Sequence, residues 1–272
     1  MSLKVGSLTH PNYPRVHPET PLTRARALMR DLSLRVVPVV REGGFLEGLL
    51  RREHVLGVAS TKSDVLVSQV MENSPLVFKT DEDATKSFRA MIEFDEWYVP
   101  VVNESTGRYV GMISLDSFLL SLDSFLREVL SADVKTHEKR ISEIMTTEVE
   151  YVSPEDFISR VWRKMLTLKY AGFPVVRGRD RVVVGIITQH DLLRKGYTRI
   201  ELESESGPRV GPRVKEAMTS PAVTLKPYNK ARDALLMMVK NDFGRVPIVN
   251  DIGVLVGIVD RSDLCNNYLG GL

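Results

Sequence analysis

The sequence predicts an α+β protein that contains four copies of one β-α-β-β-α unit, paired into two modules. A proline stands second in four short apolar segments, at residues 37–40, 99–102, 173–176 and 246–249. A glycine follows each proline by 10 or 11 residues and opens another apolar run. A methionine precedes the last three prolines by 29 residues. Self-similarity at a fixed period is the sequence signature of a repeat architecture.

The pattern of apolar residues predicts the first helix of each unit. In the third copy, Phe157, Val161, Met165 and Leu168 recur at spacings of four, four and three residues, so they share one helical face. The short segment between the methionine and this helix is predicted to form the first strand. The fourth copy shows the same order of segments.

The second half of each unit predicts two strands and a closing helix. A proline at the first residue of a strand removes no needed hydrogen bond, so the proline is expected to open the second strand. The glycine-led run, such as residues 182–187, is typical of a buried third strand. Thr188 follows this run, and Asp191 comes three residues later, which is the pattern of a capped helix start.

The repeat spacing predicts four domains, at residues 1–62, 63–130, 140–200 and 210–272. A unit of roughly 60 residues rarely buries enough apolar surface to be stable alone. We therefore expect repeats 1 and 2 to pair through their sheets, and repeats 3 and 4 likewise, in one flattened body. Residues 121–140 are predicted to hold a helix and the boundary between the two modules.

The composition excludes several classes of site. A single cysteine, Cys265, excludes a disulfide framework and a multi-cysteine metal site. The five histidines are scattered, and no pattern supports a catalytic constellation, so we expect no enzyme activity. The net charge of +2 does not favour nucleic acid. No apolar run reaches the ~18 residues of a membrane span, and no signal peptide is evident, so a cytoplasmic protein without membrane contact is expected.

These motifs resemble those of the cystathionine β-synthase (CBS) domain, a small regulatory repeat. The resemblance covers nearly the whole chain. It rests on the four proline strands, on the closures "GIITQHDLL" and "GIVDRSDL", and on the starts "MTTEV" and "MTSPAV". The resemblance implies that two repeats form a Bateman module, whose clefts bind adenosine-containing ligands such as AMP, ADP, ATP or S-adenosylmethionine.

The resemblance also gives the Thr188–Asp191 pair a second meaning. In the family, a hydroxyl residue and an aspartate at these places contact phosphate and ribose, and a carboxylate can accept both hydroxyls of a cis-diol. Around this pair the resemblance implies a shell, and a corresponding shell in repeat 4. The implied ligand-binding residues of repeat 3 are Thr147, Val152, Ala171, Gly172, Phe173, Pro174, Thr188, His190 and Asp191. Those of repeat 4 are Ser220, Leu225, Gly244, Arg245, Val246 and Asp263.

The other closures depart from the pattern, which ranks the predicted sites. Repeat 4 has Asp260 in place of the threonine, and this acid is expected to repel phosphate. Repeat 2 has Ser117 in place of the aspartate, and its Asp116 is one position early. Repeat 1 has lost both residues, and its basic closure is interpreted as a solvated helix start or as a site for a different anion. The C-terminal pair, with its best site in repeat 3, is therefore predicted to bind the ligand.

The predicted function is a stand-alone regulatory sensor of adenine nucleotides, without a cofactor or metal, that acts on an unidentified protein. Three alternatives remain open at this stage. They are an S-adenosylmethionine sensor, a nucleic-acid-binding protein that uses Arg51, Arg52 and the "GPRVGPRVK" linker, and a structural scaffold without ligand. A homodimer is compatible with each of them.

Overall fold

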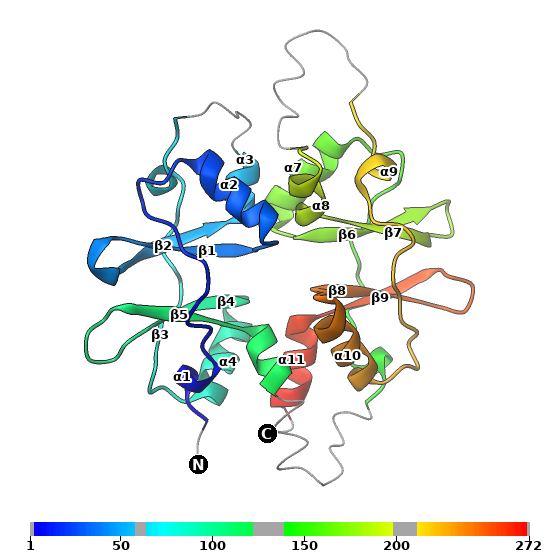
Figure 1. The fold of residues 1–272 in the computed structure, drawn as a ribbon. Helices are drawn as coiled ribbons and strands as arrows, with labels where there is room; N and C mark the ends of the chain where they lie inside the picture. The colour runs from blue at the N-terminus through cyan, green and yellow to red at the C-terminus, as the bar shows by residue number, and fades with distance from the viewer. Residues whose placement is uncertain (1–2, 58–63, 122–138, 198–210, 271–272) are drawn as a thin grey trace.

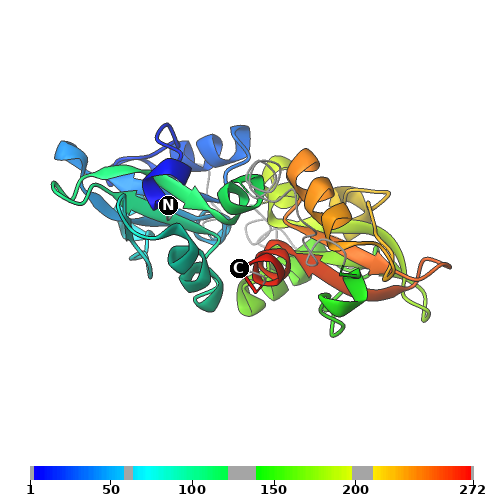
Figure 2. The ribbon, with the colours of Figure 1, turned by 90° about the horizontal axis from the view of Figure 1, so that it is seen from below.

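The computed structural model describes residues 3–57, 64–121, 139–197 and 211–270. Figure 1 shows the four repeats at the corners of one body, with repeats 1 and 2 on one side and repeats 3 and 4 on the other. Figure 2, seen from below, shows that this body is wide and shallow. The helix predicted over residues 121–140 lies almost wholly outside the described residues.

Each repeat contains a helix, two strands and a closing helix in the predicted order, and the closing helix of repeat 2 covers residues 115–121 of the described chain. Repeats 1 and 4 also begin with a short helix that was not predicted. Repeat 1 contains α1 (Val5–Leu8), α2 (Leu22–Asp31), β1 (Val36–Val40), β2 (Leu46–Arg51) and α3 (Arg52–Gly57). Repeat 2 contains β3 (Phe78–Lys79), α4 (Ala84–Glu93), β4 (Tyr98–Val102) and β5 (Tyr109–Ser114). Repeat 3 contains α7 (Ile158–Leu168), β6 (Gly172–Arg177), β7 (Val182–Thr188) and α8 (Gln189–Arg194). Repeat 4 contains α9 (Val214–Ala217), α10 (Ala231–Asn241), β8 (Arg245–Val249), β9 (Leu255–Asp260) and α11 (Arg261–Leu269).

Each repeat has a small sheet whose main part is an antiparallel hairpin, formed by β1–β2, β4–β5, β6–β7 or β8–β9. The predicted first strand is short. In repeat 2 it is β3, which pairs parallel with β4. In the other repeats it is a single parallel bridge, such as that between Val152 and Val175.

The proline is the third residue of its strand in all four repeats, so the prediction that it opens the strand was wrong. The carbonyl of Pro174 accepts a hydrogen bond from the N–H of Val152, which belongs to the short first strand. The nitrogen of a strand residue points to the same side as its carbonyl. The missing N–H therefore faces the short first strand and leaves the hairpin ladder intact.

The repeated glycines allow the sheets of paired repeats to meet. A methyl group on Gly48, Gly111, Gly185 or Gly257 would come within 2.8 Å of an atom in the segment that opens the partner repeat. These segments form bridges to the partner's hairpin: His10 pairs with Met112, and Thr219 pairs with Ile186. The pairing of repeat 1 with 2 and of repeat 3 with 4 is thereby confirmed.

The two modules pack side by side through their helices. One hydrophobic core joins repeats 1 and 3, and it contains Met29 of α2 and Met165 of α7. A second core joins repeats 2 and 4, and it contains Phe88 of α4 and Tyr268 of α11. In Figure 1 the corresponding helices lie next to one another across the middle of the body. Residues from different modules therefore meet at the centre, where the candidate sites lie.

Candidate functional site

Three cavities lie where the repeats meet. Cleft A has a volume of about 360 Å³ and is lined by Thr188 and Asp191 of repeat 3. Cleft B has a volume of about 290 Å³ and is lined by Asp260 and Asp263 of repeat 4. Cleft C has a volume of about 490 Å³ and lies in the N-terminal module beside Ser114. Volumes of this order suit ligands of nucleoside size.

The Thr188–Asp191 pair in cleft A is a capping box. The Thr188 hydroxyl accepts a hydrogen bond from the Asp191 N–H (3.1 Å), and the Asp191 carboxylate accepts from the Thr188 N–H (2.9 Å) and hydroxyl (2.6 Å). The Thr219 hydroxyl, from the opening segment of repeat 4, donates to the other Asp191 oxygen at 3.2 Å. Asp191 is only 4% exposed. These contacts fix the orientation of the carboxylate and leave acceptor capacity on the oxygen that Thr219 binds.

The wall that clefts A and B share contains three arginines, Arg35, Arg52 and Arg245. Arg52 donates to the carbonyl oxygens of Ser33 and Leu34, and Arg245 donates to that of Gly172. Arg35 stacks on the ring of Trp97 at 5.6 Å. In the described part of the chain, no carboxylate forms an ion pair with any of the three arginines.

In this arginine cluster, Arg52 is buried and Arg35 and Arg245 are half-buried, and none of the three forms a direct ion pair with a described carboxylate. Asp260 attracts Arg245 and Asp242 attracts Arg52 from longer range. Arg52 is 7% exposed, and burial together with the neighbouring Arg35 lowers the pKa of Arg52 to about 10. Burial also lowers the pKa of Arg245. Burying a cation is costly unless an anion compensates it. Guanidinium groups form strong, charge-assisted hydrogen bonds to phosphate. The cluster is therefore suited to an anionic ligand group.

His190 lies between the Thr188–Asp191 pair and the arginine cluster of cleft A. Its Nδ1 atom is 3.5 Å from the guanidinium of Arg52. Burial and the charge of Arg52 lower the pKa of His190. The imidazole is therefore neutral at pH 7 and adds no charge to cleft A.

Cleft B presents the opposite electrostatic environment. Asp260 caps α11 by accepting hydrogen bonds from the N–H groups of Ser262 and Asp263. The Asp263 carboxylate accepts only the Asp260 N–H, at 2.9 Å, because no hydroxyl replaces that of Thr188. Burial and the nearby Asp260 raise the pKa of Asp263 to about 7. A phosphate placed beside these two carboxylates would be repelled.

The closure of repeat 1 corresponds to the Thr188–Asp191 pair of repeat 3, and its charged side chains are engaged in ion pairs. The Arg51 guanidinium binds both oxygens of Glu96 at 2.9 Å and also pairs with Glu72. His54 lies 3.5 Å from Glu72. Arg51 is therefore neither a solvated helix start nor available to an anion in this cleft, and Arg52 points instead into the shared arginine cluster.

The structure groups the predicted residues differently from the sequence. Cleft A contains Ala171, Thr188, His190, Asp191, Gly244 and Arg245. Cleft B contains Ala171, Gly172, Arg245 and Asp263. Seven predicted residues line none of the three cavities: Thr147, Val152, Phe173, Pro174, Ser220, Leu225 and Val246. Five of these are buried, whereas Thr147 and Ser220 are exposed.

The regrouping follows from the crossing of paired repeats. The opening segment of repeat 4, with Thr219 and Val223, lines the cleft of Thr188, and the opening segment of repeat 3 lines the cleft of Asp260. Sequence reasoning missed Thr219 and Val223, although the pairing of the repeats could have indicated them. It also missed Arg35, which comes from the other module and has no local signal.

The comparison with protein families identifies the repeats. The model of the CBS domain matches residues 5–60, 67–124, 141–197 and 214–270. The chain belongs to the CBS domain family. It contains four CBS domains, which the structure arranges in two pairs.

Relatives of this CBS-domain protein occur in archaea. The chain is 24% identical over 277 residues to the uncharacterized protein MJ1225 of Methanocaldococcus jannaschii, covering 93% of this chain and 94% of that one. The crystal structure of MJ1225 matches with a TM-score of 0.82 at 19% identity, over 97% and 99% of the two chains. Protein MJ1404 of the same organism is 27% identical over 257 residues, which are 92% of this chain but 58% of that relative.

Two features are absent from the described residues. None of their helices is both long and apolar enough to cross a bilayer. None of their His, Cys, Asp and Glu side chains form a group of three or more that could hold a metal ion.

Proposed function

We propose that this CBS-domain protein is a regulatory sensor that binds one adenine nucleotide, AMP, ADP or ATP, in cleft A. The observation that carries the proposal is the arginine cluster. It faces the same cavity as the Thr188–Asp191 pair, and no described carboxylate forms a direct ion pair with it. A nucleotide matches both ends of this cavity, because its ribose offers a cis-diol to Asp191 and its phosphate offers negative charge to the arginines.

The remaining wall of cleft A suits a purine base. It is apolar and comes mainly from repeat 4, with Val223, Phe243 and Pro247. Three arginines and two aspartates, Asp191 and Asp242, line the whole cavity, which gives it a formal charge of +1. Adenine as the base follows from membership of the CBS family and not from these contacts.

The proposal is tested by calorimetric titration of the full chain with AMP, ATP, adenosine, S-adenosylmethionine and single-stranded DNA at two salt concentrations. We expect AMP or ATP to bind with one site, and Asp191→Ala to weaken binding by about 1–3 kcal/mol, the order for lost hydrogen bonds to a charged acceptor. Asp263→Ala, the matched change in cleft B, should leave this affinity unchanged. Equal losses in both variants, or tighter binding of DNA, would refute the proposal.

The full chain is required for this titration. Arg35 and Arg52 belong to the N-terminal module but line cleft A. A fragment of residues 140–272 would keep Thr188 and Asp191 and lose two of the three arginines. Its affinity for adenosine therefore says nothing about its affinity for a phosphorylated ligand.

A cationic nucleoside, of which S-adenosylmethionine is an example, is the second candidate ligand, and cleft B is its site. Six acidic and five basic residues line that cavity. The acidic residues are Glu53, Asp95, Glu148, Glu150, Asp260 and Asp263, and the basic residues are Arg35, Arg51, Arg52, Lys169 and Arg245. We infer a regulatory role without catalysis for the chain, exerted on a separate protein through occupancy of these clefts.

A further inference from the structure

The outer end of the C-terminal module carries exposed arginines that lie outside all three clefts. The turn between β6 and β7 contains the sequence Arg-Gly-Arg-Asp-Arg, residues 177–181. All five residues are exposed, and none of them lines cleft A, B or C. In Figure 1 this turn and the turn between β8 and β9 lie at the end of the body that is farthest from the N-terminal module.

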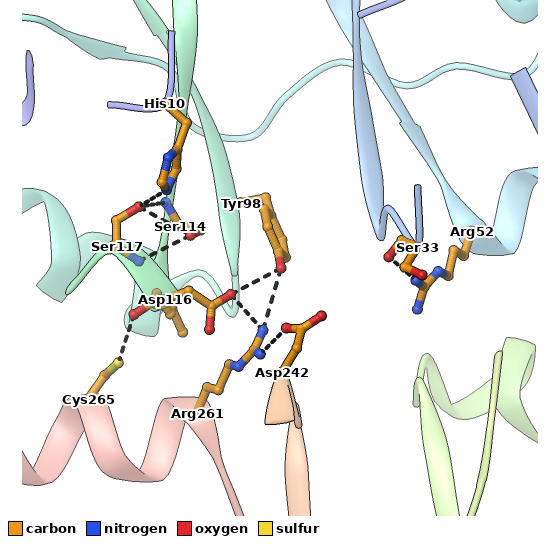
Figure 3. A network of polar contacts seen from close by, with 11 residues as sticks. His10, Ser33, Arg52, Tyr98, Ser114, Asp116, Ser117, Asp242, Arg261 and Cys265 are labelled. Atoms are coloured by element: carbon orange, nitrogen blue, oxygen red, sulfur yellow. Dashed lines mark hydrogen bonds and ion pairs between the residues drawn. The ribbon is translucent and has the colours of Figure 1, made fainter. Parts of the chain in front are cut away.

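The arginines of this turn differ from the buried arginine at the centre of the body. Arg261 donates to Asp116 and to Asp242, each at 2.6 Å, so two carboxylates of the fold hold it (Figure 3). By contrast, the side chains of the three arginines in residues 177–181 form no hydrogen bond or ion pair with a described residue. Their donors are therefore available to a molecule outside the chain.

The nearby carboxylates do not neutralise these arginines. Residues 177–181 contain three arginines and one aspartate, which give a formal charge of +2. Asp251, in the neighbouring turn, accepts a hydrogen bond from Tyr228 at 3.2 Å and lies 3.9 Å from Lys226. Glu150 forms an ion pair with Lys164. The end of the module therefore presents a net positive charge to solvent.

The two turns of this module are tied together by their backbones. The N–H of Val183 donates to the carbonyl of Gly253, and the N–H of Leu255 donates to the carbonyl of Arg181, each at 3.0 Å. The Arg181 guanidinium also stacks on the ring of Tyr151, at 5.9 Å. These contacts hold the charged turn and the β8–β9 turn side by side.

Apolar side chains are exposed next to the arginines. Ile252, in the β8–β9 turn, is 78% exposed, the largest exposed fraction among the large apolar side chains of the described residues. Tyr151 and Val182 are 40% and 36% exposed. Val182 forms a β-bridge to Val254, which brings it next to the turn of Ile252. We call this area the rim surface, and it consists of Tyr151, Arg177, Arg179, Arg181, Val182 and Ile252.

The corresponding end of the N-terminal module lacks this combination. The fifth residue after the repeated proline is Arg179 in repeat 3 and Ile252 in repeat 4. In repeats 1 and 2 the same position holds Gly43 and Ser105. Arg41, beside the β1–β2 turn, is paired with a glutamate of its own repeat at 3.3 Å. The fold of the repeat therefore does not require the rim surface.

We propose that the rim surface docks an acidic, partly apolar segment of a partner protein. Guanidinium groups form charge-assisted hydrogen bonds with carboxylates, and Ile252 and Val182 give the apolar side chains of such a segment a place to pack. A nucleic acid fits less well, because aliphatic side chains have no counterpart on a sugar–phosphate backbone. In addition, Arg181 already stacks on Tyr151, the ring that a base would need. The rim surface lies outside the clefts, so the proposal does not depend on nucleotide binding.

The test is fluorescence polarisation of the full chain with two labelled peptides, one of repeated Glu-Glu-Leu and one of repeated Glu-Glu-Ser. The leucine peptide should bind more tightly, and added salt should weaken the binding of both. Arg179→Glu should weaken the binding of the leucine peptide by about fivefold, because it replaces an attraction by a repulsion. Arg108→Glu makes the same change of charge in the exposed β4–β5 turn of the N-terminal module and should have no effect.

Ile252→Ser separates docking from general attraction between charges. The side chain is 78% exposed, so its replacement does not disturb a core. The variant should bind the leucine peptide only as weakly as the serine peptide, and its affinity for the serine peptide should not change. The proposal is wrong if the leucine peptide does not bind, if Arg179→Glu and Arg108→Glu weaken its binding equally, or if Ile252→Ser changes nothing.

Two other occupants are distinguished by the same variants. Oligouridine RNA replaces the peptide in a parallel titration, and sedimentation of the chain without peptide detects self-association. RNA that binds more tightly than the leucine peptide and is lost in Arg179→Glu would overturn the proposal. A dimer that Arg179→Glu dissociates would also overturn it, because the rim surface would then be covered by a second copy of the chain.

Discussion

Replacing Arg35 with methionine separates recognition of phosphate from recognition of the nucleoside. Apart from its stacking on Trp97, the side chain of Arg35 forms no hydrogen bond or ion pair with a described residue, so the change removes a charge and little else. A charge-assisted hydrogen bond is worth about 1.5–3 kcal/mol, which corresponds to a loss of about ten- to 150-fold in affinity for AMP. The loss stays within this range because Arg52 and Arg245 remain in the cluster.

The free protein should not be destabilised by the same change. Arg35 lowers the pKa of Arg52, which means that the two cations repel one another in the folded chain. Removing Arg35 relieves this repulsion but also removes its attraction to the Asp116 carboxylate, so the melting temperature without ligand should change little.

The assay is calorimetric titration of wild type, Arg35→Met and Arg24→Met with AMP and with adenosine. Arg24 is an exposed arginine on α2 of the same repeat and serves as the matched control. Arg35→Met should weaken AMP binding, reduce its dependence on salt concentration and leave adenosine binding unchanged. Equal AMP affinities for Arg35→Met and Arg24→Met would refute the assignment of the cluster to phosphate.

Three further predictions follow from the clefts and the sheets. Asp260→Thr gives cleft B the hydroxyl that Thr188 provides in cleft A and removes one carboxylate, so calorimetry should show two AMP molecules per chain instead of one. A stoichiometry that stays at one AMP per chain would show that Asp260 is not what excludes phosphate. Gly111→Ala places a methyl group against the backbone of His10 and should lower the free energy of unfolding by about 1–3 kcal/mol in urea titrations. The control Gly211→Ala should have almost no effect, because the nearest atom to its methyl group, on Phe157, is 3.8 Å away. The pKa of Asp263 in the folded protein is about 7, above the ~3.9 of an aspartate in the unfolded chain. The stability that this group contributes is therefore complete below pH 4 and is lost as the pH rises through 7. The melting temperature should fall from pH 5 to pH 8, and it should fall by less in Asp263→Asn.

The sequence predicted the fold because its signals are local and repeated. The helical stripe, the proline strand and the glycine-led strand each depend on residues within about one turn or one strand of each other, and four copies confirm one another. The same reasoning failed on the position of the proline within its strand. Local propensity indicates that a proline lies at an edge, but the tertiary fold decides where the short parallel strand lies, and the position of the missing N–H faces that strand.

The candidate site was only partly predictable, for a geometric reason. Thr188 and Asp191 are three residues apart, so the motif contains their mutual hydrogen bonds. The partners opposite them come from other repeats. Thr219 reaches Asp191 because repeat 4 crosses repeat 3 at Gly185, where only a glycine leaves room. A repeat pattern shows which residues face a cleft, but the opposite wall depends on how the copies pair.

The charged residues at the centre of the body come from distant parts of the sequence, so their grouping could not be predicted from local patterns. Asp116 and Arg261 are 145 residues apart, yet their ion pair defines one end of cleft C. Arg35 lines all three cavities, although nothing in its own repeat marks it as a ligand residue. Clefts A and C share Asp242 as well as Arg35, and they differ in their other aspartate, which is Asp191 in cleft A and Asp116 in cleft C. The three arginines of cleft A outnumber its two aspartates, which is the reason for the anionic ligand proposed there, whereas acidic residues outnumber basic residues by six to five in cleft B.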